Sequence, residues 1–304
     1  YHIMKFFKII RFCREKKIDI IHAHLHKPIL GALLITYFYD VKVIVHERGP
    51  VFRKGIQYSF YRIMLKLFKN RASLFIANSK ATQQKLRNKI KVPDDKVIII
   101  PNAVDLDKFK PEKSAREKIR QKLGISPEEI LIGFVGRLHY VKGPDILIKA
   151  FKLLKERGKF KLVFIGNGPL EEKIKKMTSD LKLKKDVIFL TFKENIYDYM
   201  DAFDIAVMPS RQESFGITAI EYMRKKIPLV STNVEGLAEL SLDNETAVIT
   251  NNTPEDLCRK ILKVLNDETI KNKIIEKGFK FSEKFSVQNN IKRINDCYFR
   301  VMSE

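Results

Sequence analysis

The chain has 304 residues, of which 45% are hydrophobic and 31% charged, and this much apolar surface can form sizeable cores, which excludes a predominantly disordered protein. Its length favours about two domains. Only 13 glycines and 11 prolines occur, which excludes collagen-like and linker-like chains. Three widely spaced cysteines exclude a disulfide framework or a zinc knuckle and favour a reducing compartment.

The formal charge of +22 is concentrated in the first third of the chain. Residues 1–110 hold 23 basic and 8 acidic side chains, a net of +15, against +7 for the remainder. Such a surplus suits nucleic acid, anionic lipid headgroups or phosphorylated substrates. A lysine-rich genome is the alternative explanation. No RNA-recognition, helix-turn-helix or zinc-finger pattern favours nucleic acid as the partner.

In residues 1–110, helical apolar spacing alternates with short β-branched runs. Helices are predicted over 3–16, 28–39, 53–70 and 79–89, and buried strands over 19–25, 41–46, 74–77 and 97–100. This alternation predicts a mainly parallel sheet. No run reaches the ~18 apolar residues of a membrane-spanning helix, and no signal-peptide pattern is present at the start. The chain opens at Tyr1 inside an amphipathic stretch, so we expect that an N-terminal piece is missing.

Residues 105–127 are polar and weakly patterned, and we expect them to contain a domain boundary. The alternation then restarts, with strands predicted over 130–135, 161–165, 187–190, 205–207, 229–231 and 247–249. Helices are predicted over 144–157, 169–182, 195–201, 217–226, 236–240, 254–266, 268–280 and 287–302. The pattern predicts an α/β chain of two doubly wound units with a cleft between them.

One candidate site follows the predicted strand 130–135, where Gly136 and Arg137 precede Lys142. Parallel sheets bind ligands at the carboxyl ends of their strands. Arg137 offers a planar fork for phosphate, Lys142 a compact charge, and Gly136 a close approach of the backbone. The alternative is a plain strand–loop–helix turn with two solvated cations.

A second candidate site is a pair of carboxylates, Glu213 and Glu221, on either side of Gly216. Gly216 permits a turn into the predicted helix 217–226, whose free N–H groups would attract phosphate. A carboxylate beside them can accept hydrogen bonds from sugar hydroxyls. The alternative is an acidic loop before an ordinary helix start.

Two further features have both a functional and a structural explanation. His22, His24 and His26 alternate along a predicted strand, so they could hold zinc or copper, or simply line a cleft or the core. The predicted helix 53–70 interleaves basic and aromatic residues, which suits an anionic membrane surface. The alternative is a surface helix whose apolar stripe packs on the sheet.

Successive motifs along nearly the whole chain resemble those of the group 1 (family 4) retaining glycosyltransferases of the GT-B fold. They are DIIHAH, VIVHE, LFIANSKAT, IIPNAVDLDKF, FVGRLHYVKG, VFIGNGP, AVMPSRQESFGITAIE and VSTNVEGLAEL. The resemblance implies an α/β GT-B architecture: two Rossmann-like doubly wound domains facing across a cleft, the first one incomplete. It assigns 1–108 to the acceptor-side domain, 109–284 to the nucleotide-sugar domain, and 285–304 to a helix packing back on the first domain.

The same resemblance implies roles for individual residues. The donor would be a UDP- or GDP-sugar, with no metal and no cofactor. The implied catalytic residues are Glu213, which would hold the transferred sugar, and His46. The implied nucleotide-sugar-binding residues are Gly136, Arg137, Lys142, Gly166, Gly168, Phe215, Gly216 and Glu221. Of these, Arg137 and Lys142 would bind the diphosphate and Glu221 the ribose, while backbone near residues 191–192 would meet the base.

The sequence departs from the family pattern at Ala103, Thr191, Lys225-Lys226 and Asn233-Val234, where small or glycine residues are usual. These departures bear on donor preference more than on reaction type. The expected function is sugar transfer to a lipid-linked or polysaccharide acceptor, in the cytoplasm or peripherally on the inner face of the cytoplasmic membrane. The alternatives are a sugar-nucleotide epimerase of the same fold, an inactive fragment, or a basic binding protein.

Overall fold

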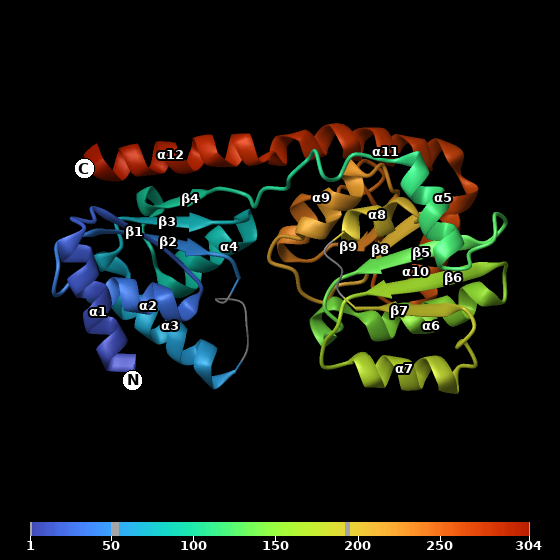
Figure 1. The fold of residues 1–304 in the computed structure, drawn as a ribbon, viewed down its shortest axis with the longest axis horizontal. Coiled ribbons are helices and arrows are strands. Elements are labelled where there is room, and N and C mark those ends of the chain that lie inside the picture. The colour runs from blue at the N-terminus through green and yellow to red at the C-terminus, as the bar shows by residue number, and fades with distance from the viewer. Residues whose placement is uncertain (1, 50–54, 192–194, 304) are drawn as a thin grey trace. The chain divides into compact units, whose positions relative to one another are not determined.

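The computed structural model describes residues 2–49, 55–191 and 195–303, which form two compact units (Figure 1). Unit 1 comprises Tyr1–Asn102 with Gln288–Glu304, and unit 2 comprises Ala103–Val287. Residues 103–108, which the sequence assigns to the first domain, therefore pack with unit 2. One cause is a backbone hydrogen bond of 2.8 Å from Val104 N–H to the Phe285 carbonyl, which ties the two ends of unit 2 together.

Unit 1 is built on a parallel sheet with the strand order β1-β2-β3-β4. The strands are β1 Ile20–His24, β2 Lys42–Glu47, β3 Leu74–Ala77 and β4 Val97–Ile99. The helices are α1 His2–Glu15, α2 His26–Ile35, α3 Ile56–Phe68 and α4 Lys80–Lys85, followed by a π-turn at Leu86–Ile90 and short 3-10 turns at Lys69–Arg71 and Asp94–Lys96. Within the described residues, the strand order runs in one direction without a reversal.

Side chains alternate across this sheet and give it two different faces. Val43, Val45 and Phe75 face α2 and α3, where Tyr61 and Leu65 are buried. The residues that alternate with these along the strands, among them Ile44, Leu74 and Ile76, point to the opposite face. There they form a second core with Cys297 and Val301 of α12 (Val287–Ser303). A helix from the far end of the sequence thus covers the face that the local helices leave open (Figure 1).

Unit 2 holds a parallel sheet in the order β10-β9-β8-β5-β6-β7. The strands are β5 Ile130–Val135, β6 Phe160–Ile165, β7 Val187–Leu190, β8 Ile205–Met208, β9 Leu229–Thr232 and β10 Val248–Thr250. From β5 the chain first winds toward β7 and then returns to β8 and winds toward β10. The order therefore reverses between β5 and β8, which makes this sheet doubly wound.

Helices cover both faces of the unit 2 sheet (Figure 1). They are α5 Lys113–Lys122, α6 Pro144–Lys155, α7 Glu171–Asp180, α8 Ile196–Asp201, α9 Ile217–Arg224, α10 Pro254–Asn266 and α11 Glu268–Ser282, with 3-10 turns at Tyr140–Lys142, Glu235–Glu239 and Glu283–Phe285. One core contains residues of α6, α7 and α10, and the other contains residues of α8 and α9. Strands β3, β5 and β7 begin and end where the sequence predicts.

Candidate functional site

The reversal in strand order places two loops next to each other at the carboxyl edge of the unit 2 sheet. One follows β5 and contains residues 136–143; the other follows β8 and contains residues 209–216. In open α/β sheets, ligands bind at such a switch point, outside the carboxyl ends of the strands. Both carboxylates and both cations of the sequence-predicted site lie on these two loops or on α9 directly after them.

Glycines allow the loops after β5 and β6 to lie against each other. A Cβ atom on Gly166 would approach the Gly136 carbonyl oxygen to 2.2 Å, and one on Gly168 would approach the Leu138 oxygen to 2.5 Å. The two loops are joined by backbone hydrogen bonds from Gly136 N–H to the Ile165 carbonyl (3.0 Å) and from Leu138 N–H to the Asn167 carbonyl (2.9 Å). These positions therefore require glycine and present bare backbone at the edge of the sheet.

Arg137 extends from this platform. Its side chain is exposed and makes no hydrogen bond or ion pair with any described residue. A guanidinium group held at the end of a strand without a protein partner is well suited to a bidentate contact with phosphate.

Lys142, the second predicted phosphate ligand, is paired instead. Its Nζ donates to Oε2 of Glu213. The Glu213 side chain is 11% exposed and that of Lys142 27%, so the pair is largely shielded from water. The structure therefore brings the two predicted residues together from the two loops, where their charges compensate each other.

Arg211 fixes the relative position of the two loops, and sequence reasoning missed it. Its guanidinium makes a bidentate ion pair with Asp145 at 2.8 and 2.7 Å, donates to the Tyr140 carbonyl at 2.8 Å and lies over the Tyr140 ring. Asp145 is in the first turn of α6, which begins right after Lys142 and Gly143. Arg211 therefore holds the β8 loop against the β5 loop, which keeps Lys142 and Glu213 within reach of each other.

Gly216 is the N-cap residue of helix α9. It has φ +97° and offers no side chain, so the first N–H groups of the helix have no capping side chain. Phe215 lies just before it, but its side chain is buried and packs edge-on against Phe285. Any contact of Phe215 with a ligand must therefore use its backbone. The helix start and the Arg137 guanidinium together supply donors for an anion.

Glu221 lies one turn into α9, and its carboxyl makes no hydrogen bond with a described residue. Burial raises the pKa of this carboxyl to about 7, because the charged form loses hydration without gaining a partner. A ligand hydroxyl would supply the missing hydrogen bond. Of the predicted contact with the base at residues 191–192, Phe192 lies outside the described residues, and Thr191 is exposed.

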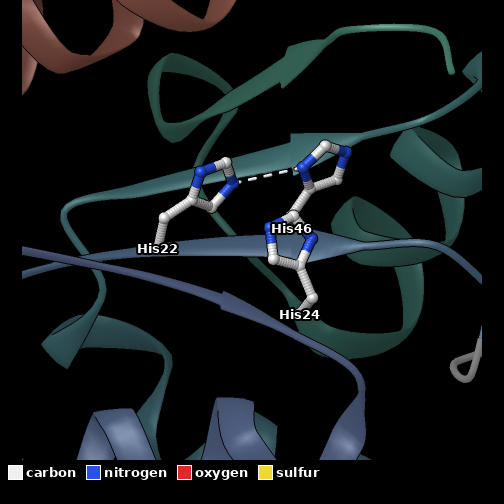
Figure 2. Close-up of side chains that lie close together, drawn as sticks. All are labelled: His22, His24 and His46. Atoms are coloured by element: carbon white, nitrogen blue, oxygen red, sulfur yellow. Dashed lines mark hydrogen bonds between the residues drawn. The ribbon is translucent and has the colours of Figure 1, made fainter. Parts of the chain in front are cut away.

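In unit 1 a cluster of imidazoles lies at the carboxyl ends of β1 and β2 (Figure 2). His24 is directly opposite His46 in the parallel register, and His22 lies two residues earlier on the same face. His22 Nε2 is 3.1 Å from His46 Nδ1, and His22 Nδ1 is 2.8 Å from the hydroxyl of Tyr298 on α12. The prediction that His22, His24 and His26 share one face of a strand is therefore wrong for His26. This residue is the first of α2, and its ring lies against the rings of Tyr58 and Tyr61.

Burial keeps this cluster uncharged. Burial, together with the nearby charge of Arg48, lowers the pKa of His22 to about 4 and that of His46 to about 2. His46 is 1% exposed, and its Nε2 has no hydrogen-bond partner among the described residues. His46, the predicted catalytic histidine, thus offers a neutral imidazole with one nitrogen still to be satisfied.

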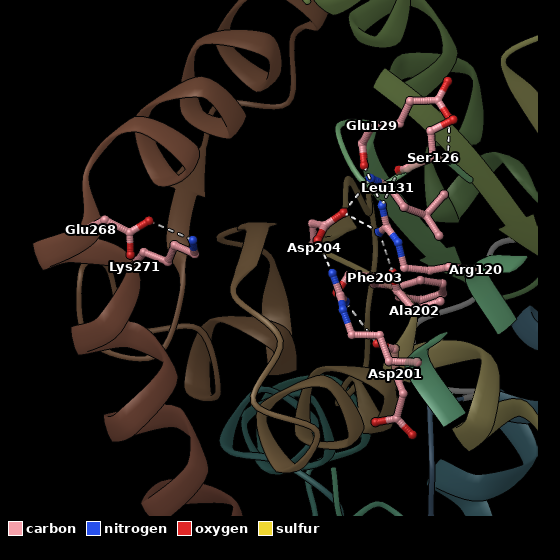
Figure 3. Close-up of polar contacts among 11 residues, drawn as sticks. Arg120, Ser126, Glu129, Leu131, Asp201, Ala202, Phe203, Asp204, Glu268 and Lys271 are labelled. Atoms are coloured by element: carbon pink, nitrogen blue, oxygen red, sulfur yellow. Dashed lines mark hydrogen bonds and ion pairs between the residues drawn. The ribbon is translucent and has the colours of Figure 1, made fainter. Parts of the chain in front are cut away.

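The opposite, amino-terminal edge of the unit 2 sheet holds a pocket lined by Arg116, Asp204, Lys226 and Lys271 among others. Asp204 receives ion pairs from both Arg116 and Arg120 of α5, and it accepts a 2.7 Å hydrogen bond from Leu131 N–H (Figure 3). Lys271 pairs with Glu268 at 2.8 Å. The charges of Arg116, Asp204 and Lys271 are thus engaged within the fold, in contrast to Arg137 at the carboxyl edge.

The sequence matches the family Glycosyl transferases group 1 over residues 115–281 and Glycosyltransferase Family 4 over residues 1–108. An uncharacterized glycosyltransferase of Methanocaldococcus jannaschii is 31% identical over 73% of this chain. The matched part spans 59% of the length of that relative. The capsular polysaccharide biosynthesis glycosyltransferase CapM of Staphylococcus aureus is 27% identical over 83% of this chain and 68% of its own length.

The solved structure of Anabaena HepE in complex with UDP-glucose is similar in fold, with a TM-score of 0.86 at 22% identity over 97% of this chain and 82% of that one. None of the described helices has the length and apolar character needed to cross a membrane. The family match covers more than half of the residues, and both units are parallel-sheet Rossmann-like domains of the GT-B type, so the chain belongs to the group 1 glycosyl transferases.

Proposed function

We propose that this chain transfers a sugar, with retention of anomeric configuration, from a nucleotide-diphosphate sugar to a polysaccharide or lipid-linked acceptor. The observation that carries the proposal is the Arg137 guanidinium, which has no partner among the described residues, on the same switch-point loop as Lys142 of the Lys142–Glu213 pair. The diphosphate of a donor could bind the Arg137 guanidinium, and the hydroxyls of its sugar could donate hydrogen bonds to the Glu213 carboxylate.

In this proposal the diphosphate binds Arg137, the start of α9 and Lys142. Lys142 would exchange Glu213 for phosphate, and this exchange frees the Glu213 carboxylate to accept hydrogen bonds from the sugar. Cations and helix N–H groups would stabilise the charge that develops on the leaving diphosphate, so no divalent metal is required. Transfer activity that persists in excess EDTA would agree with this, whereas strict dependence on Mg²⁺ or Mn²⁺ would contradict it.

Glu221 would accept hydrogen bonds from the ribose. Glu221→Gln should therefore weaken binding of both the nucleoside diphosphate and the nucleotide sugar. Glu213→Gln should leave binding of the free diphosphate intact and depress transfer of the sugar. Titration calorimetry with UDP and GDP, set against turnover of the matching sugar nucleotides, separates the two roles. If both variants lose affinity for the free diphosphate equally, the assignment of Glu221 to the ribose and of Glu213 to the transferred sugar is wrong.

The transferred sugar would keep its anomeric configuration. NMR of the freshly formed product distinguishes retention from inversion by the coupling constant of the anomeric proton. An inverted product would overturn this part of the proposal. Release of a sugar with an altered ring stereocentre and no acceptor product would instead favour the epimerase alternative.

CapM is named for capsular polysaccharide biosynthesis, which supports a glycan acceptor for this chain as well. Helix α3 supports an acceptor at an anionic membrane surface. Its buried face carries Tyr61 and Leu65, yet a second apolar stripe on the same helix is exposed. The stripe consists of Ile56, Phe60, Ile63 and Leu67. Exposed Lys66 lies beside it, and a helix with this arrangement binds at the headgroup level of anionic bilayers.

Co-sedimentation with vesicles tests the membrane contact. The chain should bind vesicles of anionic lipid and not those of neutral lipid, and Phe60→Ser with Lys66→Glu should reduce binding. Phe299→Ser removes an even more exposed ring from α12 and serves as the control. The absence of binding to anionic vesicles at low salt would rule the contact out.

A further inference from the structure

The histidine cluster of unit 1 contains more imidazoles than the proposed transfer reaction uses. The resemblance implies a catalytic role for His46, whereas neither it nor the proposed reaction gives a catalytic role to His22 or His24. The ligand nitrogens of all three side chains lie within 4.8 Å of one another (Figure 2). All three belong to adjacent strands of one sheet, so the backbone register fixes their spacing.

We propose that His22, His24 and His46 form a binding site for a divalent transition metal, with Zn²⁺ as the preferred ion. Imidazole nitrogens are ligands that Zn²⁺ accepts readily, and sites with three protein ligands leave a fourth position open to water or substrate. This site would be separate from the diphosphate site of unit 2, for which the proposed function requires no metal.

The spacing of the nitrogens suits a shared ion. With Zn–N bonds of 2.0–2.1 Å, two ligands of a tetrahedral site lie about 3.3 Å apart. His22 Nε2 and His46 Nδ1 are 3.1 Å apart and face each other. A hydrogen bond between them requires one of the two nitrogens to carry a proton, and this is His46 Nδ1 when His22 donates its other N–H to Tyr298. If His46 moves its proton to Nε2, both facing nitrogens present lone pairs to an ion, and neither ring gains or loses a charge.

Tyr298 prepares His22 for this role. A histidine that binds a metal through one nitrogen usually donates the N–H of the other to a fixed partner, which sets the ring orientation and the tautomer. The Tyr298 hydroxyl, 2.8 Å from His22 Nδ1, is such a partner and leaves Nε2 as the ligand atom.

Arg48 works against the ion. The positive charge of Arg48 disfavours protonation of each of the three imidazoles, and for the same electrostatic reason it would repel a bound dication. With three neutral ligands and a nearby cation, we expect a Kd on the order of micromolar rather than nanomolar, or about −8 kcal/mol. Occupancy would also engage His46 and so inhibit transfer, a consequence that rests on the proposed function, whereas binding itself does not.

Titration of the full chain with Co²⁺, followed by visible absorption, and with Zn²⁺, followed by calorimetry, tests the site. One ion per chain should bind, and the Co²⁺ spectrum should lack a thiolate charge-transfer band because the three cysteines are not ligands. His24→Ala and His22→Gln should each weaken binding by at least about 10- to 100-fold, and Tyr298→Phe by about 10-fold.

His26→Ala is the matched control, since His26 is the adjacent histidine that lies outside the cluster. It should bind the ions as the wild type does. Circular dichroism melts establish that each variant is folded. The site is disproved if the wild type shows no saturable binding of Co²⁺ or Zn²⁺ at 1 mM, if a thiolate band appears, or if folded His24→Ala and His22→Gln variants keep the wild-type affinity.

Discussion

The carboxyl edges of the two sheets differ in the chemistry that they present. The unit 2 edge carries full charges, Arg137 and the Lys142–Glu213 pair, whereas the unit 1 edge carries the neutral imidazoles of His22 and His46. Burial moves the pKa of Glu221 up and that of His46 down, and each shift favours the uncharged form. The same parallel architecture thus presents charged side chains at one edge and, next to the charge of Arg48, neutral imidazoles at the other.

The two edges are also built differently. Unit 2 presents backbone, because its glycines let adjacent loops touch. Unit 1 presents side chains, which the register of β1 and β2 places opposite each other. The contrast predicts that unit 2 is sensitive to any added Cβ atom, whereas unit 1 is sensitive to changes at its side chains.

The largest expected effect is that of Gly166→Ala. Gly166 has φ +138°, and its Cβ would meet the Gly136 carbonyl oxygen at 2.2 Å. Backbone strain and overpacking each cost about 1–3 kcal/mol, so the free energy of unfolding should fall by roughly 2–6 kcal/mol. Gly31→Ala is the control, since nothing lies within 4 Å of its Cβ in α2, and it should stabilise by about 0.5–1 kcal/mol. Equal urea midpoints for the two variants would contradict this difference between the units.

The next effect is the pH dependence of stability that Glu221 causes. Burial raises its pKa from the ordinary 4.5 to about 7 in the folded chain. Its contribution to stability is therefore fully present below pH 4.5 and is lost as the pH rises through 7. Glu221→Gln stays neutral. At 1.36 kcal/mol per pKa unit, the variant should be more stable than the wild type by about 3 kcal/mol at pH 8.5 and equally stable at pH 4.5. A constant difference across this range of urea titrations would refute the assignment.

A smaller effect is expected when the Lys142–Glu213 pair is broken. Lys142→Met leaves the carboxylate of Glu213, 11% exposed, without its partner, which should lower the free energy of unfolding by about 1–3 kcal/mol. Adding Glu213→Gln removes the stranded charge and should restore more than half of the loss. A double-mutant cycle in urea measures the coupling directly. Additive losses would show that the two side chains do not stabilise each other.

Sequence reasoning located most strands and missed one helix, for a physical reason. The strands are continuous apolar runs, which a buried parallel sheet requires, so their positions are visible in the chain. Helix α5 buries only Ile119 and is held largely by ion pairs of Arg116 and Arg120 with Asp204, more than 80 residues away. No apolar stripe marks such a helix, and it lies within residues 105–127, where a boundary was expected.

The candidate site was predicted as a set of residues but not as a set of contacts. Strand order brings Lys142 next to Glu213, and strand register brings His46, instead of the predicted His26, next to His22 and His24. A single sequence reveals neither the order nor the register. At Lys225 the family usually has a small residue, and the sequence analysis relates this difference to donor preference. The structure buries Lys225 in an ion pair with Asp201 and a 2.8 Å hydrogen bond to the Lys110 carbonyl, so it anchors residues 110–112.

Calorimetric titration with UDP-, GDP- and ADP-sugars tests the central claim most directly, namely that the carboxyl edge of unit 2 binds the donor. The wild type should bind one class of donor, and Arg137→Ala should weaken that binding by about 10- to 150-fold, since a charge-assisted contact is worth roughly 1.5–3 kcal/mol. Lys149→Ala removes an exposed cation from α6 and should leave the affinity unchanged. A folded Arg137→Ala variant that binds the donor as tightly as the wild type would contradict the account.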